Sequence, residues 1–210
     1  MLRRGKKFLM TILAGAVFLS GFYFLIVRPW HTRWNCTGED VSRVIAGDEL
    51  VPHPTFITNR GISIQAKPDS IWPWLVQLGE GRGGFYSYDW IDHLLGFDIN
   101  SADRILPQFQ SPLQPGGIIP RGMYIWAVKN DQYLVLGTPP SFAGFQTTWA
   151  LALFPQTDGS TKLISRLRIH YDRWSLPNLL IAAVLDPGQF IMEQKMLRTL
   201  KTLVERKEPS

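Results

Sequence analysis

The chain has 210 residues, of which 45% are hydrophobic and 19% are charged, and its formal net charge is +5. This composition excludes a disordered or collagen-like chain, and the length suits one domain with an appendage rather than two domains. Four of the five net positive charges come from one N-terminal cluster, Arg3, Arg4, Lys6 and Lys7. The rest of the chain is close to neutral and lacks the basic surface of a nucleic-acid-binding protein, so we predict no nucleic-acid partner.

Cysteine and histidine usage argues against a disulfide framework or a metal site. The single cysteine, Cys36, has no internal partner, and the four histidines show no HxxxH or HExxH spacing. We therefore predict neither a metal site nor a cofactor.

The first long apolar segment is Phe8–Val27, twenty residues without a charge. A helix of this length spans about 30 Å, the thickness of the hydrocarbon core of a bilayer. A cleavable signal peptide is the alternative, but its apolar core is only about 7–15 residues long and is followed by small residues. Here the small cluster Ala14–Ala16 lies in the middle. We predict an uncleaved transmembrane anchor over residues 8–27.

The charges that flank this span predict its orientation. Four basic residues precede it, whereas only Arg28 and Arg33 follow it closely. Because basic residues are enriched on the cytoplasmic side, residues 1–7 are expected in the cytoplasm and the remaining chain outside it. We expect a single-pass membrane protein.

A connector, residues 28–54, is expected next, with one short helix near residues 39–45. A strand is predicted over residues 57–66 and a helix over residues 68–78, with Pro68 in the first turn, a kink or late start at Pro73, and a stop at Gly79.

Glycines at 79, 81, 83 and 84 superficially resemble a phosphate-binding loop. The segment lacks the GK[ST] ending of such loops, so we predict a plain turn.

The second half of the chain predicts a short helix, a meander of strands and a long helix. The short helix covers residues 88–95 and ends at Gly96, and residues 100–122 are expected to be irregular. Asp186 and Pro187 suit an N-cap and a first-turn proline of a helix that runs to about Arg206. Short turns between the strands predict antiparallel pairing; the strands are expected at residues 123–128, 132–137, 147–154 and 161–171.

Four ordered motifs carry a family resemblance: Trp72–Gly79 (WPWLVQLG), Gly83–Asp89 (GGFYSYD), Ser101–Pro107 (SADRILP) and Phe190–Leu197 (FIMEQKML). Together they resemble a bacterial group of the SRPBCC superfamily, some members of which are labelled polyketide cyclase/dehydrase. The resemblance covers about residues 55–205. One departure is Gly116-Gly117, where relatives often have Gly-Asp.

The resemblance implies an α+β, START-like helix-grip domain over residues 55–207, with a curved antiparallel sheet around the C-terminal helix and a hydrophobic cavity between them. It supplies no catalytic residues. Several strands are apolar on both faces, which predicts a sandwiched sheet or a lined cavity. The side chains that we expect to line it are Phe85, Tyr124, Trp126, Trp149, Leu151 and Met196.

Polar residues gather between residues 82 and 104. Asp89, Asp92 and His93 have i, i+3, i+4 spacing, so they are weak candidates for an acid/base pair. Arg82, Asp103 and Arg104 are candidates for a polar anchor of an anionic head group. The alternative is structural: an aspartate pairs with an arginine and fixes residues 97–120 to the helices.

A second polar row alternates with apolar residues: Arg166, Arg168 and His170. It could meet a lipid phosphate, but we predict the solvated face of a sheet.

Three hypotheses for function follow. The first is membrane-anchored binding of a hydrophobic small molecule or lipid in an internal cavity. The second is a cyclase/dehydrase-like enzyme that uses acid/base residues near 89–104. The third is a non-catalytic structural or interaction module.

Overall fold

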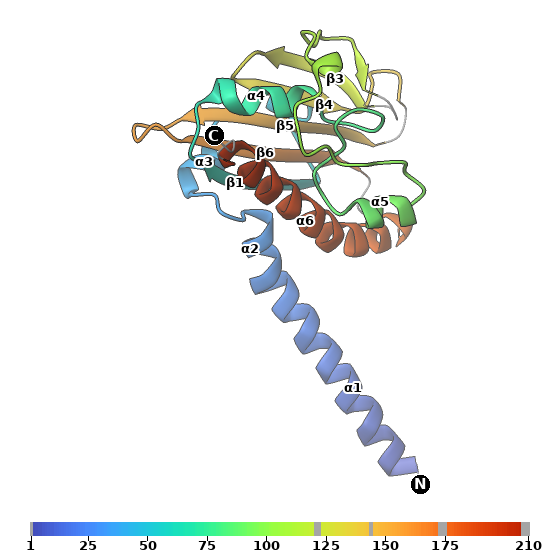
Figure 1. Cartoon of the computed structure of the whole chain (residues 1–210). Coiled ribbons are helices and arrows are strands. Elements are labelled where there is room, and N and C mark those ends of the chain that lie inside the picture. Colours follow the sequence, from blue (N-terminus) through green and yellow to red (C-terminus); the bar gives the residue numbers. More distant parts are fainter. Residues whose placement is uncertain (1, 120–122, 143–144, 172–175, 207–210) are drawn as a thin grey trace.

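The computed structural model describes residues 2–119, 123–142, 145–171 and 176–206, and shows one α+β domain from which a long N-terminal helix projects (Figure 1). Helix α1 (Leu2–Phe22), the π-helical turn η1 (Tyr23–Val27) and helix α2 (Arg28–Thr32) follow one another without a break. Among the described residues, the stretch Met10–Thr32 is the one helix long and apolar enough to cross a membrane. Its apolar side chains are exposed; Leu25, for example, is 79% exposed.

The domain is built on a six-stranded sheet in which every neighbouring pair is antiparallel, with the order β1-β6-β5-β4-β3-β2. The predicted meander is confirmed, and the turns before β4 and β6 use the left-handed conformation at Asp131 and Gly159. The strands are β1 (Phe56–Ile64), β2 (Ile118–Ile119), β3 (Met123–Lys129), β4 (Tyr133–Gly137), β5 (Gln146–Pro155) and β6 (Thr161–His170).

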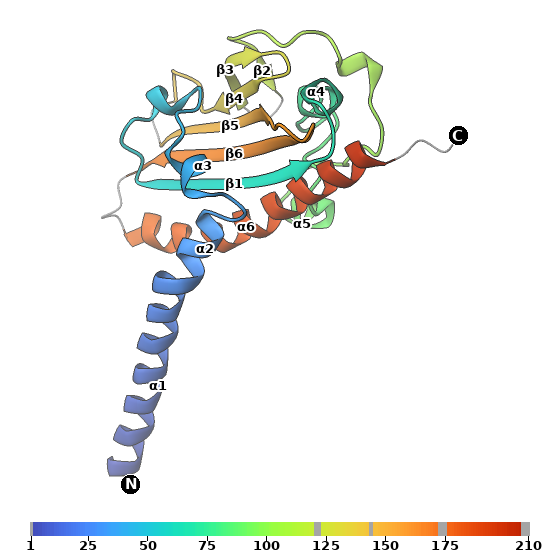
Figure 2. The same cartoon turned by 90° about the vertical axis from the view of Figure 1, so that its left-hand side faces the viewer.

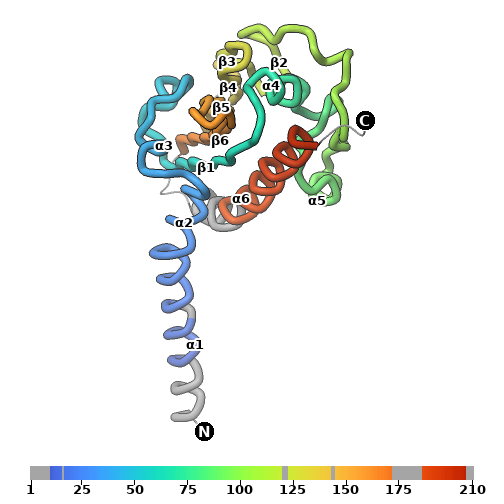
Figure 3. The backbone as a smooth tube through the Cα atoms, turned by 60° about the vertical axis from the view of Figure 1, so that its left-hand side comes forward, coloured from blue at the N-terminus to red at the C-terminus, as the bar shows by residue number. Residues whose placement is uncertain are grey.

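Helices cover one face of the sheet, as Figures 2 and 3 show. The longest is α6, and α4 packs beside it against the same core. This is the helix-grip-like arrangement expected from the sequence. The remaining elements are α3 (Gly38–Ser42), η2 (Asp48–Leu50), α4 (Pro68–Val76), α5 (Asp89–Leu94), η3 (Pro107–Phe109) and α6 (Leu176–Glu205).

The main core lies between the sheet and these two helices. Residues that pair directly across strands point to the same face, and one such row is Arg60, Ser165, Leu151 and Leu134. We call the side of the sheet that bears this row the helix face. Its apolar members pack with side chains of α4 and α6, for example Leu200, and together they form the larger of two buried clusters. Burial of these side chains supplies the main stabilisation of the domain.

The opposite side of the sheet is covered by residues 38–55, and we call it the connector face. One of its rows is Asn59, Arg166, Ala150 and Val135. Ile45 packs against Val135 and Ala150 in the smaller buried cluster. The segment expected as a connector thus contributes buried side chains to the domain.

The prediction of a solvated Arg166–His170 row is wrong at its first two positions. Arg166 is only 3% exposed, and its guanidinium donates to Asn59 Oδ1, Asp48 Oδ2 and the carbonyls of residues 40, 41 and 43. Arg168 is half-buried and also donates to Asp48, and only His170 is exposed. The reason is that residues 38–55 fold over this face and bring backbone carbonyls within reach of both arginines.

The predicted start of the C-terminal helix is also wrong. Helix α6 begins at Leu176, ten residues earlier, and continues through Pro187. Asp186 does not cap the helix, because its carboxylate accepts a hydrogen bond of 2.8 Å from Arg28 Nε. A tertiary ion pair therefore replaces the local capping interaction that the sequence suggested.

The glycine-rich segment forms a turn, as predicted. Gly79 and Gly84 exchange two backbone hydrogen bonds of 3.0 and 3.1 Å. Gly79 has a φ of +120°, and a Cβ at this position would lie 2.3 Å from Ile119 Cγ2. Both conformation and space thus require glycine here.

Replacement of Arg166 by methionine should destabilise the protein strongly, because Asp48 and three backbone carbonyls would lose their buried donor. We expect the free energy of unfolding to fall by about 3–5 kcal/mol. Thermal unfolding of the full chain in detergent, followed by circular dichroism, measures this loss. The control Lys129→Met changes an exposed side chain and should cost less than about 0.5 kcal/mol; equal losses in the two variants would contradict the role of Arg166.

Candidate functional site

A buried ion pair joins the sheet to α6. Arg60 on β1 is fully buried and Glu193 on α6 is 5% exposed, and Arg60 Nη1 donates to Glu193 Oε2. Gln189, one helical turn before Glu193, accepts from the same nitrogen and donates to the same carboxylate. Two charges are seldom placed in a core unless they are paired and hydrogen-bonded, and this pair meets that condition.

A polar chain leads from this pair to an aromatic pair on the sheet. Ser165, on β6, donates its hydroxyl hydrogen to Glu193 Oε1 and accepts a hydrogen bond of 2.7 Å from Trp149 Nε1. The indole ring of Trp149 lies 6.2 Å from the ring of Phe85, centroid to centroid. The indole is therefore held in a fixed orientation, with its polar edge toward the charges and its apolar surface against Phe85.

The same cluster reaches the end of the N-terminal helix. Arg60 Nε donates to the carbonyl of His31 on α2 at 3.0 Å, and the Arg60 guanidinium lies 5.2 Å from the ring of Phe190. The His31 side chain is buried, with its Nδ1 3.7 Å from Asp186 Oδ1. These contacts attach α2 to both the sheet and α6.

Burial of the helix face decreases along its strands. Leu151 and Leu163 are fully buried, whereas Trp149, Leu167 and Ile169, farther along the same face of β5 and β6, are only half-buried. The site thus combines half-exposed apolar side chains with a few polar groups at its inner end. Such a combination suits a ligand with an apolar body and one polar group.

Three buried polar atoms of this cluster, Arg60 Nη2, His31 Nδ1 and Asp186 Oδ1, lack a hydrogen-bond partner among the described residues. Within the described part of the chain, Arg60 Nη2 is buried and makes no hydrogen bond. An unpaired buried donor on a charged group is costly. A carboxylate or phosphate oxygen would satisfy it.

The six predicted ligand-lining residues divide between the two faces of the sheet. Phe85, Trp149, Leu151 and Met196 belong to the core on the helix face. Trp126 packs with the smaller cluster on the connector face and donates from Nε1 to the Thr138 carbonyl. Tyr124, which pairs with Gly137 and lies 5.0 Å from the Trp126 ring, shares that face. The structure therefore does not bring all six together.

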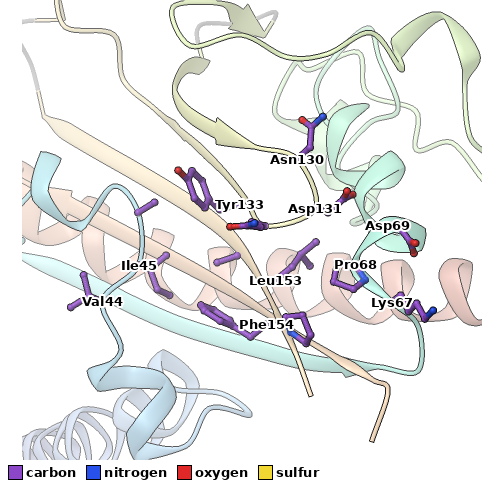
Figure 4. A pocket seen from close by; sticks show the side chains of 14 residues that line it. Val44, Ile45, Lys67, Pro68, Asp69, Asn130, Asp131, Tyr133, Leu153 and Phe154 are labelled. Atoms are coloured by element: carbon purple, nitrogen blue, oxygen red, sulfur yellow. The ribbon is translucent and has the colours of Figure 1, made fainter. Parts of the chain in front are cut away.

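A separate groove of about 730 Å3 lies where β4 begins and β5 ends (Figure 4). Its walls come from residues 44–46, the start of α4, the turn before β4 and the end of β5. None of the six predicted ligand residues is among its lining residues. The groove mixes exposed apolar residues such as Val44 with Lys67, Asp69 and Asp131, and no cluster of polar groups converges in it.

The weak acid/base candidates on α5 do not form a pair. The Asp89 carboxylate accepts hydrogen bonds from the backbone N–H and the hydroxyl of Ser101, at 2.8 and 2.6 Å. Asp92 is buried and accepts from the Ser87 hydroxyl, whereas His93 is exposed to solvent. Asp89 thus fixes the irregular segment that begins near residue 97, as the structural alternative expected, although its partner is a serine rather than an arginine.

The predicted polar anchor is dispersed. Arg82 is half-buried, donates to the carbonyls of Val76 and Phe109, and lies over the Phe109 ring. Burial lowers the pKa of its guanidinium. Asp103 and Arg104 are exposed. Arg82 braces the loop through its Nη2 donor, whereas its buried Nε has no hydrogen-bond partner in the described part of the chain.

The structure shows the surroundings of Cys36 and of the potential metal ligands in the described part of the chain. Burial, reinforced by the nearby Asp40, raises the pKa of the Cys36 thiol to about 11, so the thiol is protonated at neutral pH. Among the described residues, no three histidine, cysteine or acidic side chains lie close enough together to hold a metal ion.

The sequence interpretation missed Arg60, Ser165 and Glu193, although a signal was present. Arg60 lies at an inward position of β1, between Thr58 and Ile62, and Glu193 lies in register with Met196 and Leu200 on the apolar stripe of α6. A charged residue at a core position of each of two elements is the pattern of a buried pair.

Comparisons with known proteins do not assign this chain to a family. No family model matches the sequence, and no curated protein matches it. Among solved structures, the chain is similar to protein MLL2253 from Mesorhizobium loti, with 14% identity over 73% of this chain and all of that chain and a TM-score of 0.41.

Two other solved structures are similar to this chain at comparably low sequence identity. Protein CV1439 from Chromobacterium violaceum has 10% identity, 72% and 98% coverage and a TM-score of 0.42. DynU16, from the dynemicin biosynthetic locus, has 13% identity over 71% of this chain and 48% of that chain, with a TM-score of 0.39. At these identities and TM-scores the similarities show neither a family nor a function.

A double-mutant cycle tests the buried pair. Glu193→Leu should lower the free energy of unfolding by about 3–5 kcal/mol, because it leaves Arg60 buried without a counter-charge. The double variant Arg60→Met/Glu193→Leu should recover most of that loss. Thermal unfolding of the four full-length proteins in detergent measures the coupling, and strictly additive losses would contradict it.

Asp92 predicts a pH-dependent contribution to stability. Burial raises its pKa above the ordinary value of 3.8. Folding therefore favours the protonated carboxyl group. Its contribution to the free energy of unfolding is complete below pH 3.8 and is lost as the pH rises through the folded-state pKa. Asp92→Asn should raise the melting temperature at pH 7, and the gain should vanish at acid pH.

The matched control is Asp89→Asn on the same helix, which weakens the bonds to Ser101 and should give no gain at either pH. A gain for Asp92→Asn that is the same at both pH values would contradict the role of ionisation.

Proposed function

We propose that this protein binds a hydrophobic small molecule or lipid against the helix face of its sheet, while α1 anchors it in a membrane. The ligand lies beside Trp149 and Phe85, and its polar group faces Arg60. The domain lies outside the cytoplasm, since the positive charges precede the span.

The observation that carries the proposal is the combination of half-exposed apolar residues and an unpartnered arginine nitrogen on one face of the sheet. Trp149, Leu167 and Ile169 are only partly covered, although the rest of this face is closed by α4 and α6. Ser165 and Glu193 hold the Trp149 indole in place, so its apolar surface is preorganised for a ligand. Arg60 adds a donor for an anionic oxygen.

The chemical class of ligand follows from these groups. A fatty acid, a phospholipid or another apolar carboxylate would present a hydrocarbon chain to the aromatic pair and an oxygen to Arg60. A neutral hydrocarbon would leave the arginine nitrogen unpaired.

Binding of cis-parinaric acid, a fluorescent fatty acid, tests the proposal on the full chain in detergent. Trp149→Ala should raise the Kd at least about tenfold, because it removes the apolar surface on which the chain of the ligand lies. The matched control is Trp126→Ala, on the opposite face, which should change the Kd less than about twofold. Trp149→Phe, which keeps an aromatic ring, should bind better than Trp149→Ala.

Two results would overturn the proposal. One is an equal loss of binding in Trp149→Ala and Trp126→Ala when both variants retain the wild-type melting temperature. The other is a wild-type protein that neither binds the probe nor releases an apolar compound, detected by mass spectrometry, when it is extracted with organic solvent.

A further inference from the structure

Helix α5 has an inverted distribution of polar and apolar side chains. Its acidic residues are turned inward, since Asp89 is bonded to Ser101 and Asp92 is only 8% exposed. Three large apolar residues are turned outward: Trp90 is 65% exposed, Leu94 is 78% exposed, and Leu95, just after the helix, is 66% exposed; Ile91 is half-buried, and His93 is also exposed. A short helix on a water-facing surface normally shows the opposite pattern. The outer face of α5 therefore suits apolar surroundings.

The position of α5 in the molecule indicates what those surroundings are. In both Figure 1 and Figure 2, α5 and α6 lie on the side of the domain from which α1 leaves. Tyr88, just before α5, is joined to α6 by Lys195, whose ammonium lies 5.7 Å from the tyrosine ring. Helix α5, which bears these exposed apolar residues, is thus held on the side of the domain from which α1 leaves.

The orientation of the domain relative to α1 is fixed by contacts. The carbonyl of His31 accepts from Arg60, Arg28 is paired with Asp186, and Trp30 packs against Phe190 with 5.3 Å between the ring centroids. Because α2 continues the N-terminal helix, these contacts set the angle at which the domain is carried. With α1 across a membrane, α5 would lie on the side of the domain nearest the lipid head groups.

We propose that α5 is a second membrane contact, in which Trp90, Leu94 and Leu95 insert into the outer interface of the bilayer. The proposal rests on the anchoring by α1 stated above. Tryptophan and leucine are the residues that suit this depth, where an apolar side chain meets the boundary of the acyl chains and an indole N–H stays near water. The position of α5 favours a lipid surface as the partner, because the surface of the bilayer lies where the proposed span ends.

Depth measurement with a fluorescent label tests the proposal. Leu94→Cys in a Cys36→Ser background is labelled with a nitrobenzoxadiazole maleimide, and the full chain is reconstituted into vesicles of phosphatidylcholine and phosphatidylglycerol that contain nitroxide-labelled lipids. We expect at least about twofold quenching at position 94. The matched control is Lys129→Cys, an exposed position at the end of β3, a strand that lies on the opposite side of the domain from α1 (Figure 2); it should not be quenched.

A third label distinguishes failure of this inference from failure of the anchor. Leu19→Cys lies within the proposed span and should be quenched strongly. Quenching at position 19 without quenching at position 94 would overturn the membrane contact of α5 and leave the anchor intact. The absence of quenching at both positions would overturn the anchor itself.

A second copy of the chain is the other possible occupant of this surface. Cross-linking of two Leu94→Cys chains by a bismaleimide, together with unquenched label at position 94, would assign the surface to a dimer and overturn the proposal. Quenching at position 94 with no cross-linked dimer would support it.

Discussion

The buried ion pair between Arg60 and Glu193 is the interaction on which the arrangement of this molecule depends. It connects β1 to α6, and through the His31 carbonyl and Ser165 it also connects α2 and β6. Placing two charges in a core is costly, so each must be positioned to meet the other. This requirement fixes the register of α6 against the sheet and the attachment of the N-terminal helix at the same point.

The two faces of the sheet use arginine differently. On the connector face, Arg166 directs all its donors to protein acceptors and holds residues 38–55 in place. On the helix face, Arg60 keeps one nitrogen without a partner among the described residues. A guanidinium whose N–H groups all donate to protein acceptors has no donor left for a ligand. One that keeps a free N–H group beside half-exposed aromatic rings can bind a ligand oxygen. For this reason the proposed site lies on the helix face.

Contacts at Asp186 connect the N-terminal helix to the helix that carries Glu193 of the proposed site. Arg28 and His31 at the end of the span contact Asp186, and Asp186 lies on the same helix as Glu193. The domain is therefore carried at a set angle to α1, with α5 and α6 on the side from which α1 leaves (Figures 1 and 2). If α1 spans a membrane as we propose, a hydrophobic ligand that leaves the membrane would meet this side of the domain first. The exposed apolar residues of α5 and the proposed binding face would then serve the same ligand.

The sequence by itself determined the apolar N-terminal helix, the antiparallel meander and the glycine turn at Gly79, because each depends on local features such as uninterrupted hydrophobicity, period-two alternation or a required positive φ. Of the six residues that the sequence predicted to line a ligand cavity, Phe85, Trp149, Leu151 and Met196 lie together on the helix face, and their contact with a ligand stays a prediction. Only the tertiary structure decided that Tyr124 and Trp126 lie on the other face, that Arg166 is buried and that α6 begins before Asp186. These outcomes depend on which segment packs over which face, and on partners far away in the chain such as Arg28 and Asp48. Local pattern cannot encode them, because the energy of a buried charge is set by the partner that folding brings to it.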